Sequence, residues 1–252
     1  MSRLQKAIQR IQSGEGRQLG FGAITQEKPR AMLLGATVRR AEDVKTAVDA
    51  GVDFMLVQAG KAAEAAALVK EAETGKTPIG AWVSDLDADG AAKLAEAGCD
   101  FVACTLEGTA ASAVDTDRMG HVLAVTGDID DTRLRTLGPL NLEGLFVKRP
   151  AGNMTLVQQT DLIRLASLAG APLLVSSDAG ATVAELRVLR DSGAAAIVAL
   201  EATSQAELKT LGETLRSVPP KAKPQTGRDM PLVPSMGASH EHEEDEFPEI
   251  DE

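Results

Sequence analysis

Residues 142–150 combine a short apolar run with a lysine, an arginine and a proline at its end. An apolar run of this length is typical of a buried strand, so Lys148 and Arg149 would follow directly after the strand. A lysine amine in such a place can attack a carbonyl carbon or polarise a carbonyl oxygen. Asp128 follows another apolar run, next to Gly127, and its carboxylate can act as acid or base. We therefore expect Lys148 and Asp128 to carry any catalysis.

Polar side chains also follow the other apolar runs. Two stretches begin alike, with Gly-Val-Asp at residues 51–53 and Gly-Cys-Asp at residues 98–100, and residues 142–148 can be aligned with both. This alignment makes Gln58, Thr105 and Lys148 equivalent, on one face of their strands. The full set that we expect to bind substrate or phosphate is Arg39, Gln58, Thr105, Arg149, Ser176, Ser177 and Gly180. Further polar residues near these strand ends are Ser84, Asp85, Glu107, Thr126, Asp178 and Glu201.

A repeating unit must position these residues. Eight apolar runs, at 32–37, 54–58, 79–83, 101–105, 122–126, 145–148, 173–176 and 197–200, alternate with helical patterns at 41–50, 62–74, 89–97, 109–119, 130–137, 156–169, 183–192 and 205–217. Short runs that are apolar on both faces, separated by helices, predict a parallel sheet. Eight such units predict an α/β protein with the (β/α)₈ TIM-barrel fold, whose functional site lies at the carboxyl ends of the strands. A doubly wound open sheet is the alternative, although its G-x-G-x-x-G motif is absent after the first run.

Three parts of the chain differ in character. Residues 1–30 are expected to hold an extra helix at 2–13 and a segment at 19–24 that closes one end of the barrel, and residues 31–218 to form the barrel itself. Residues 219–252 are first Pro-rich and then acidic, with three basic and nine acidic side chains, and we expect them to be disordered. This tail is either a solubilising end or, over residues 239–252, a docking motif for a partner protein through Phe247 and Ile250.

The bulk composition limits the classes of partner. A net charge of −11 argues against nucleic acid and anionic membranes. The N-terminus lacks the apolar core of a signal peptide, and no apolar run approaches the ~20 residues that span a bilayer. Cys99 and Cys104 are five positions apart on one expected strand, so they face opposite ways and stay unpaired, which is typical of a reducing compartment. The sequence thus predicts a soluble, cytoplasmic protein with a small-molecule substrate, and we expect a homo-oligomer.

The sequence gives little indication of a metal site or of a catalytic histidine. His121 falls at the amino end of its expected strand, away from the functional end, and His240 and His242 lie in the tail. We therefore expect no metal site and no required cofactor, with Mg²⁺ held by Asp128, Asp178 and Glu201 as the remaining option. Asp85 and Asp178 have a second interpretation as N-caps of the helices that follow them.

The seventh unit carries a resemblance to known proteins. Residues 172–180 read Pro-Leu-Leu-Val-Ser-Ser-Asp-Ala-Gly, and a helical pattern and then Gly-Ala-Ala-Ala-Ile-Val follow. This order resembles the phosphate-binding TIM barrels, which include synthases of thiamine, tryptophan and histidine biosynthesis and read Pro-Val-Ile-Ala-Ser-Gly-Gly there. The resemblance implies a phosphate held by backbone amides of Ser176, Ser177, Gly180, Ala181 and Thr182 at a helix N-terminus. Ser177 and Asp178 replace the family's two glycines.

The sixth unit resembles the Schiff-base strand of class I aldolases such as deoxyribose-phosphate aldolase, which reads Gly-Ala-Asp-Phe-Ile-Lys. Lys148 matches by strand number and by face, although it stands two residues later and Gly144 replaces the aspartate. The resemblance implies a lyase of the aldolase type, acting on a small carbonyl compound that can be phosphorylated. The alternative is a non-catalytic barrel that binds or assembles with a partner through its acidic tail.

Overall fold

The computed structural model describes residues 1–13, 30–72, 74–150, 152–200 and 203–221 of the 252-residue chain. The expected closing segment at 19–24, Glu201 and the acidic tail lie outside these residues. No helix in the described ranges is long and apolar enough to span a membrane.

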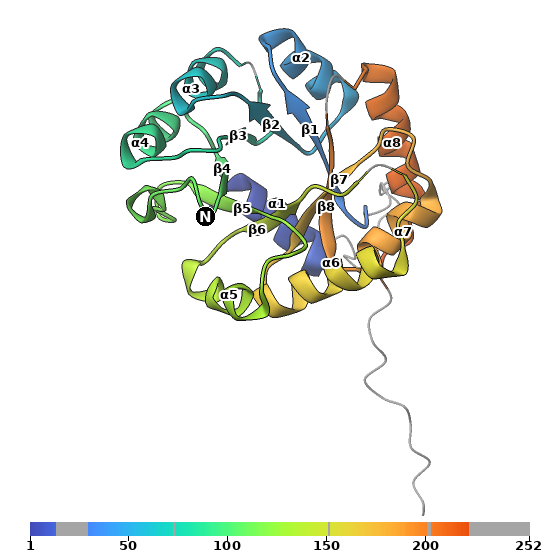
Figure 1. The fold of residues 1–252 in the computed structure, drawn as a ribbon. Coiled ribbons are helices and arrows are strands. Elements are labelled where there is room, and N and C mark those ends of the chain that lie inside the picture. The colour runs from blue at the N-terminus through green and yellow to red at the C-terminus, as the bar shows by residue number, and fades with distance from the viewer. Residues whose placement is uncertain (14–29, 73, 151, 201–202, 222–252) are drawn as a thin grey trace, which may run out of the picture. The chain divides into compact units, whose positions relative to one another are not determined.

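Eight parallel strands form a closed ring in which each strand pairs with its neighbours in chain order (Figure 1). The strands are β1 (Leu33–Val38), β2 (Phe54–Gln58), β3 (Ile79–Trp82), β4 (Phe101–Thr105), β5 (Gly120–Val125), β6 (Gly144–Val147), β7 (Leu173–Ser177) and β8 (Ala194–Ala199). Pairing of β1 with β8 closes the ring. The TIM barrel predicted from the apolar runs is therefore confirmed, and the open-sheet alternative is wrong.

Among the residues that the structure describes, seven α-helices surround the ring and an eighth precedes it. They are α1 (Arg3–Ser13), α2 (Ala41–Ala50), α3 (Ala62–Glu71), α4 (Ala88–Glu96), α5 (Asp131–Thr136), α6 (Leu156–Ala169), α7 (Val183–Asp191) and α8 (Gln205–Ser217), with the 3₁₀ turns η1 (Ala111–Ala113) and η2 (Gly138–Leu140).

The helix expected at 109–119 is wrong, because this segment contains only the 3₁₀ turn η1. Its backbone pairs with the β3–α4 connection instead. Thr109 forms an isolated parallel bridge with Leu86, and the amide of Ala110 donates to the carbonyl of Leu86 at 2.8 Å. A backbone engaged in extended pairing cannot also form helical hydrogen bonds.

The inside of the barrel is filled by bulky side chains that pack into space left by glycines. The rings of Phe54 and Phe101 are fully buried and meet edge to face with centroids 5.9 Å apart. A Cβ added at Gly35 would lie 2.3 Å from the Phe54 ring, and one at Gly80 would lie 2.4 Å from the Phe101 ring. Each glycine therefore provides the volume that the phenylalanine on the next strand fills, as close packing of a barrel interior requires.

Helix α1 closes the amino-terminal end of the barrel. Leu4 and Ile8 are buried against inner side chains such as Phe54 and Phe101, which begin their strands. The Asp100 carboxylate accepts the backbone amides of Arg3 and Leu4, both at 2.9 Å. In Figure 1, α1 crosses the centre of the ring behind the strands, so the view is onto the carboxyl ends.

A second contact anchors the start of α1. The hydroxyl and backbone amide of Ser2 both donate to the Glu143 carboxylate, which is only 6% exposed. Burial is the main cause that raises the pKa of Glu143 above its ordinary value, and the Ser2 bonds and the chain's amino group oppose it.

Both cysteines are free, as expected, and both are buried, although Cys99 lies two residues before β4 rather than on the same strand as Cys104. Burial raises the pKa of Cys99 to about 12 and also raises that of Cys104. Neither thiol is therefore suited to act as a nucleophile.

Candidate functional site

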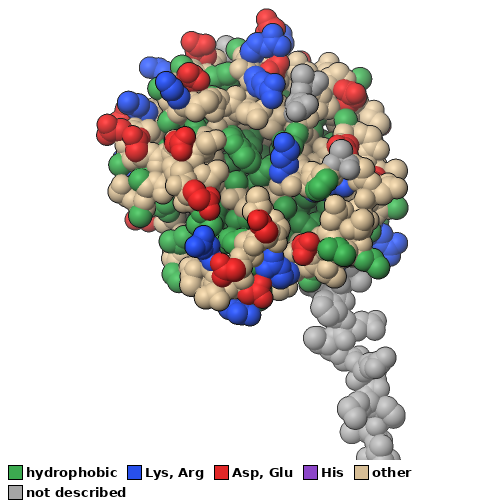
Figure 2. Space-filling view, in the orientation of Figure 1, with side chains coloured by type: hydrophobic (Ala, Val, Ile, Leu, Met, Phe, Trp, Pro, Cys, Tyr) green, Lys and Arg blue, Asp and Glu red, His purple; other side chains and the backbone are tan. Residues whose placement is uncertain are grey.

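The floor of the barrel mouth is aromatic. The Trp82 ring, at the end of β3, meets the ring of Phe146 edge to face, with centroids 4.7 Å apart and an interplanar angle of 85°. The partly buried side chains of Ala124 and Leu200 pack against the same inner cluster. Figure 2 shows hydrophobic side chains at the bottom of a hollow in the centre of this face. Sequence reasoning missed Trp82, although its two-residue spacing from Gly80 on one strand would have placed it on the inward face.

Gln58, Thr105 and Lys148 extend the inward-facing positions of their strands toward the mouth. They follow Leu56, Ala103 and Phe146, which are buried inside the barrel, by two residues each. The hydroxyl of Thr105 donates to the carbonyl of Ser84 at 2.8 Å and accepts the amide of Gly108 at 3.1 Å. Thr105 is thus committed to its own loop, whereas Gln58 and Lys148 are exposed.

Two cations at the mouth have no carboxylate partner within the described ranges. Arg39 follows β1 and donates from Nε and Nη2 to the amide oxygen of Gln58, at 3.1 and 2.9 Å, so its partner is neutral. Lys148 is exposed and makes no hydrogen bond or ion pair with any residue that the structure describes. Unneutralised positive charge in a concave site attracts anions.

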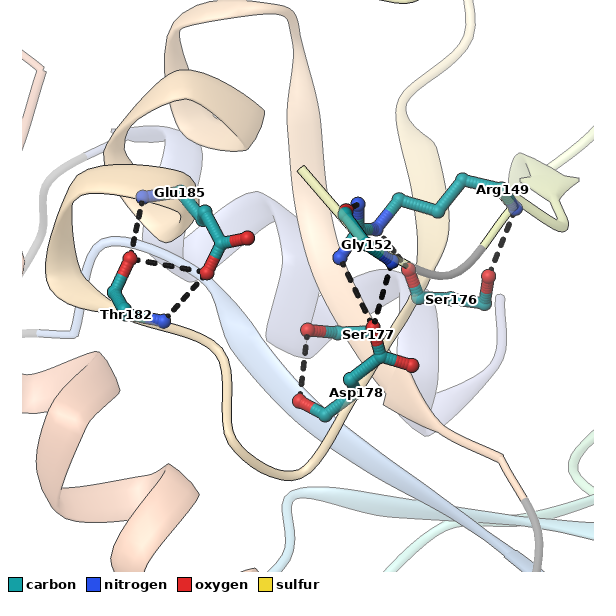
Figure 3. Close-up of polar contacts among 7 residues, drawn as sticks. All are labelled: Arg149, Gly152, Ser176, Ser177, Asp178, Thr182 and Glu185. Carbon is teal, nitrogen blue, oxygen red and sulfur yellow. Dashed lines mark hydrogen bonds and ion pairs between the residues drawn. The ribbon is translucent and has the colours of Figure 1, made fainter. Parts of the chain in front are cut away.

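Arg149, in contrast, holds two loops together (Figure 3). Its backbone amide donates to Oγ of Ser176 at 2.9 Å, and its guanidinium donates to the carbonyls of Ser176 and Gly152 at 3.2 and 2.8 Å. The guanidinium also lies 3.6 Å from the carboxylate of Asp178, and the Arg149 side chain is only 8% exposed. These contacts give Arg149 a structural role that joins the loop after β6 to the loop after β7.

The helices after β7 and β8 begin with capping boxes that use their own carboxylates. The amide of Thr182 donates to the Glu185 carboxylate at 2.8 Å, and the amide of Glu185 donates to Oγ1 of Thr182 at 3.3 Å (Figure 3). The backbone bond from Thr182 is the main cause that lowers the pKa of Glu185. Ser204 and Glu207 repeat the arrangement at the start of α8. A phosphate at either helix start would have to displace a carboxylate.

The loop that carries Asp128 is fixed by an arginine that sequence reasoning missed. Arg164, from α6, donates to the carbonyls of Gly127 and Ile129 at 2.5 and 3.0 Å and pairs with Asp131 at 2.6 Å. The Asp128 side chain is exposed, and a hydrogen bond with the Thr126 side chain is the main cause that lowers its pKa. Asp128 is therefore ionised near neutral pH and suited to accept a proton rather than donate one.

The interpretation of Asp85 and Asp178 as helix caps is wrong. The N-cap of α4 is Asp87, whose carboxylate accepts the amide of Gly90 at 2.7 Å, and the N-cap of α7 is Thr182. A cap must lie directly before the first helical residue to reach the amides of the first turn, and neither Asp85 nor Asp178 does. Where the structure describes the chain, no three metal-ligating side chains gather, and Glu201 lies outside that part.

A recess of about 210 Å³ lies outside the ring, where β1 meets α2 and α8. Its polar lining includes Thr46 and Asp43, whose carboxylate accepts the amides of Arg39 and Arg40 at 2.9 and 3.0 Å. Asp43 therefore shapes the β1–α2 turn. Lys148 and Trp82 do not line this recess, so we place the candidate site in the mouth.

Comparisons with known proteins identify the fold of this chain. The sequence matches no family model and no curated protein. Among solved structures, a Mycobacterium tuberculosis tryptophan synthase is similar over 86% of this chain and 98% of its own, with 13% identity and a TM-score of 0.63. A KGPDC from Streptococcus mutans is similar over 75% of this chain and 99% of its own, with 13% identity and a TM-score of 0.58. At these identities the likeness shows a TIM-barrel fold shared with enzymes.

Proposed function

We propose that the protein is a TIM-barrel enzyme of the lyase type, which binds a small carbonyl compound carrying an anionic group in the barrel mouth. The observation that carries this proposal is the pair of cations, Arg39 and Lys148, that have no carboxylate partner among the described residues and lie at the rim of an aromatic floor. Positive charge that the protein does not neutralise itself, next to apolar surface in a concave site, is available to an anionic ligand.

The chemistry of the site assigns a role to each part. The apolar body of the substrate lies over Trp82 and Phe146. The Lys148 amine attacks the carbonyl carbon to form an imine with loss of water, and Arg39, positioned by Gln58, binds the anionic group. Asp128 accepts the proton that leaves the substrate. The protonated imine takes up the electrons of the carbon–carbon bond that breaks, and the resulting enamine is reprotonated and hydrolysed by water, which frees Lys148 and the product.

One observation favours a non-catalytic binding barrel as a second candidate. The capping boxes of Glu185 and Glu207 occupy the helix starts at which phosphate is held in the barrels that residues 172–180 resemble. Ser176 and Ser177 are the last two residues of β7, so of the three expected phosphate-binding residues only Gly180 would offer a loop amide. The anionic group is therefore assigned to Arg39, and a phosphate is one of several groups that would fit there.

Reductive trapping tests the imine. The full chain is incubated with small aldehydes and ketones that carry a carboxylate or a phosphate, then reduced with borohydride, and its peptides are measured by mass spectrometry. We expect the mass of the reduced adduct on the Lys148 peptide. Lys148→Arg keeps the charge but cannot form the imine, so it should lose the adduct and retain ligand binding.

A matched control separates this adduct from random modification of surface amines. Lys70, on α3, is also exposed, and Lys70→Arg should leave trapping unchanged. Binding without any adduct at Lys148 across the panel would favour the non-catalytic barrel. Neither binding nor adduct would reject both.

A further inference from the structure

The outer face of α6 is uncharged. The large or hydroxyl-bearing side chains at its exposed positions are Leu156, Val157, Thr160, Ile163 and Ser167. Leu156, Val157 and Ile163 are 78%, 70% and 42% exposed, which is unusual for large aliphatic side chains. We call these five residues the α6 face.

The two charged residues of α6 are not among its exposed positions. Asp161 and Arg164 are both partly buried, and Arg164 is turned toward the loop before α5, where it binds the carbonyl of Gly127. The five side chains of the face are therefore aliphatic or hydroxyl-bearing, and none of them is charged.

The other six helices around the ring each expose charged side chains. Examples are Glu42 and Asp49 on α2, Glu64 and Lys70 on α3, Asp89 on α4, Arg133 and Arg135 on α5, Arg187 and Asp191 on α7, and Glu207 and Lys209 on α8. The contrast between α6 and its neighbours shows that the uncharged face is a local feature rather than a property of the whole surface.

Neighbouring elements also expose apolar side chains. Leu140, in η2, is 42% exposed and Val183, at the start of α7, is 40% exposed. Helix α6 lies between α5 and α7 in Figure 1, and Figure 2 shows hydrophobic side chains at the surface over its end near the mouth. A helix of this length covers only about 21 Å, so these neighbours are needed to approach the ~800 Å² that each partner buries in a stable interface.

We propose that the α6 face is the contact between two copies of this chain in a two-fold symmetric dimer. A net charge of −11 makes two copies repel each other over most of their surfaces, and the α6 face is where they can approach without opposing like charges. In a two-fold interface the same patch meets itself, so it must be complementary to itself. Uncharged aliphatic and hydroxyl-bearing side chains satisfy this condition, because the same groups can pack against each other without opposing like charges.

Light scattering during size-exclusion chromatography of the full chain tests the dimer. We expect the wild-type chain to have twice the 26.3 kDa mass of one copy. Ile163→Glu and Thr160→Glu each place two like charges in the contact and should halve the mass at the same concentration, with an unchanged circular dichroism spectrum. Thr210→Glu, on α8, is the matched control, because both hydroxyls are exposed and bond to a backbone carbonyl of their own helix, at 2.8 Å for Thr160 and 3.0 Å for Thr210.

Chemical cross-linking gives a readout that does not depend on charge. Cys99 and Cys104 are buried, so Thr160→Cys introduces one accessible thiol among the described residues. A short bis-maleimide should join two copies of this variant and should not join copies of Thr210→Cys. A monomeric wild-type chain would overturn the proposal, and so would a dimer that survives Ile163→Glu or that cross-links equally through Thr210→Cys.

Discussion

At the scale of single residues, the phenylalanine rings inside the barrel leave no room for a side chain at the glycines they pack against. The φ angle of Gly80 lies outside the left-handed region, so the requirement for glycine there comes from the Phe101 ring and not from backbone strain. Gly35 and Phe54 repeat the arrangement on the first two strands.

We predict that Gly80→Ala lowers the free energy of unfolding by about 1–3 kcal/mol, because the added methyl group overlaps a ring in a close-packed interior. Urea unfolding followed by circular dichroism measures the loss. In the double variant Gly80→Ala with Phe101→Leu, the smaller side chain should accept the methyl group, so the two losses should not add. Additive losses would show that the two residues do not share this space.

The sequence predicted the direction of inward side chains but not their partners. Gln58, Thr105 and Lys148 could be placed on one face because side chains alternate along a strand. The binding of Arg149 to Ser176, Gly152 and Asp178 depends on the path of two loops that are adjacent only in the folded barrel. No spacing within the sequence contains that information.

At the scale of elements, the buried Glu143 that anchors the start of α1 makes stability depend on pH. The folded-state pKa of Glu143 is raised above its ordinary value of 4.5, so the folded chain binds more protons than the unfolded chain between these two values. The contribution of this group to stability is therefore complete at low pH and is lost as pH rises through the folded-state pKa.

We predict that wild-type stability, relative to that of Glu143→Gln, falls as pH is raised from 4.5 through the folded-state pKa, because the amide does not titrate. Urea unfolding of both chains across this range measures the difference. Carboxylates elsewhere, such as Glu185 and Glu207, have lowered pKa values and act in the opposite direction, but they are common to both chains and cancel. A relative stability of the wild type that rises with pH would contradict the prediction.

The elements themselves were largely predictable. Residues 54–58, 101–105 and 156–169 were predicted with the ends that the structure shows, because apolar runs and helical spacing reflect burial directly. The segment 109–119 failed because its backbone pairs with Leu86, a contact between residues more than twenty positions apart. The two predicted helix caps were also wrong, because the helices begin later than expected: the N-caps are Asp87 and Thr182, two and four residues after Asp85 and Asp178.

At the scale of the whole molecule, the net negative charge of the chain opposes the proposed dimerisation. Two chains of net charge −11 repel at long range, and the α6 face contributes no charge to offset this. We predict that dimerisation strengthens as sodium chloride is raised from about 20 to about 300 mM, since the Debye length shortens from about 20 Å to about 6 Å over this range. Sedimentation equilibrium at several salt concentrations measures the dissociation constant. Weaker association at higher salt would indicate ion pairs in the contact instead.

The barrel could be predicted from the sequence because it depends on the regular alternation of apolar runs and helical patterns and not on particular residues. Eight repeats of an apolar run and a helix predicted the ring, although the two solved structures described above share only 13% of their residues with this chain. Function depends on a few side chains and loops, and these are what such distant similarity does not preserve.

The position of Trp82 gives the molecule an optical reporter of its own mouth. The chain has one tryptophan and no tyrosine, so its emission after excitation near the red edge of the indole band comes from the floor of the candidate site alone. A ligand that settles over this ring will change the polarity around the indole and shift or quench the signal, without any label. Titration of the unmodified protein can thus rank small carbonyl compounds by affinity before a reaction is known. The same fluorescence titration measures how Lys148→Arg and Arg39→Gln change these affinities.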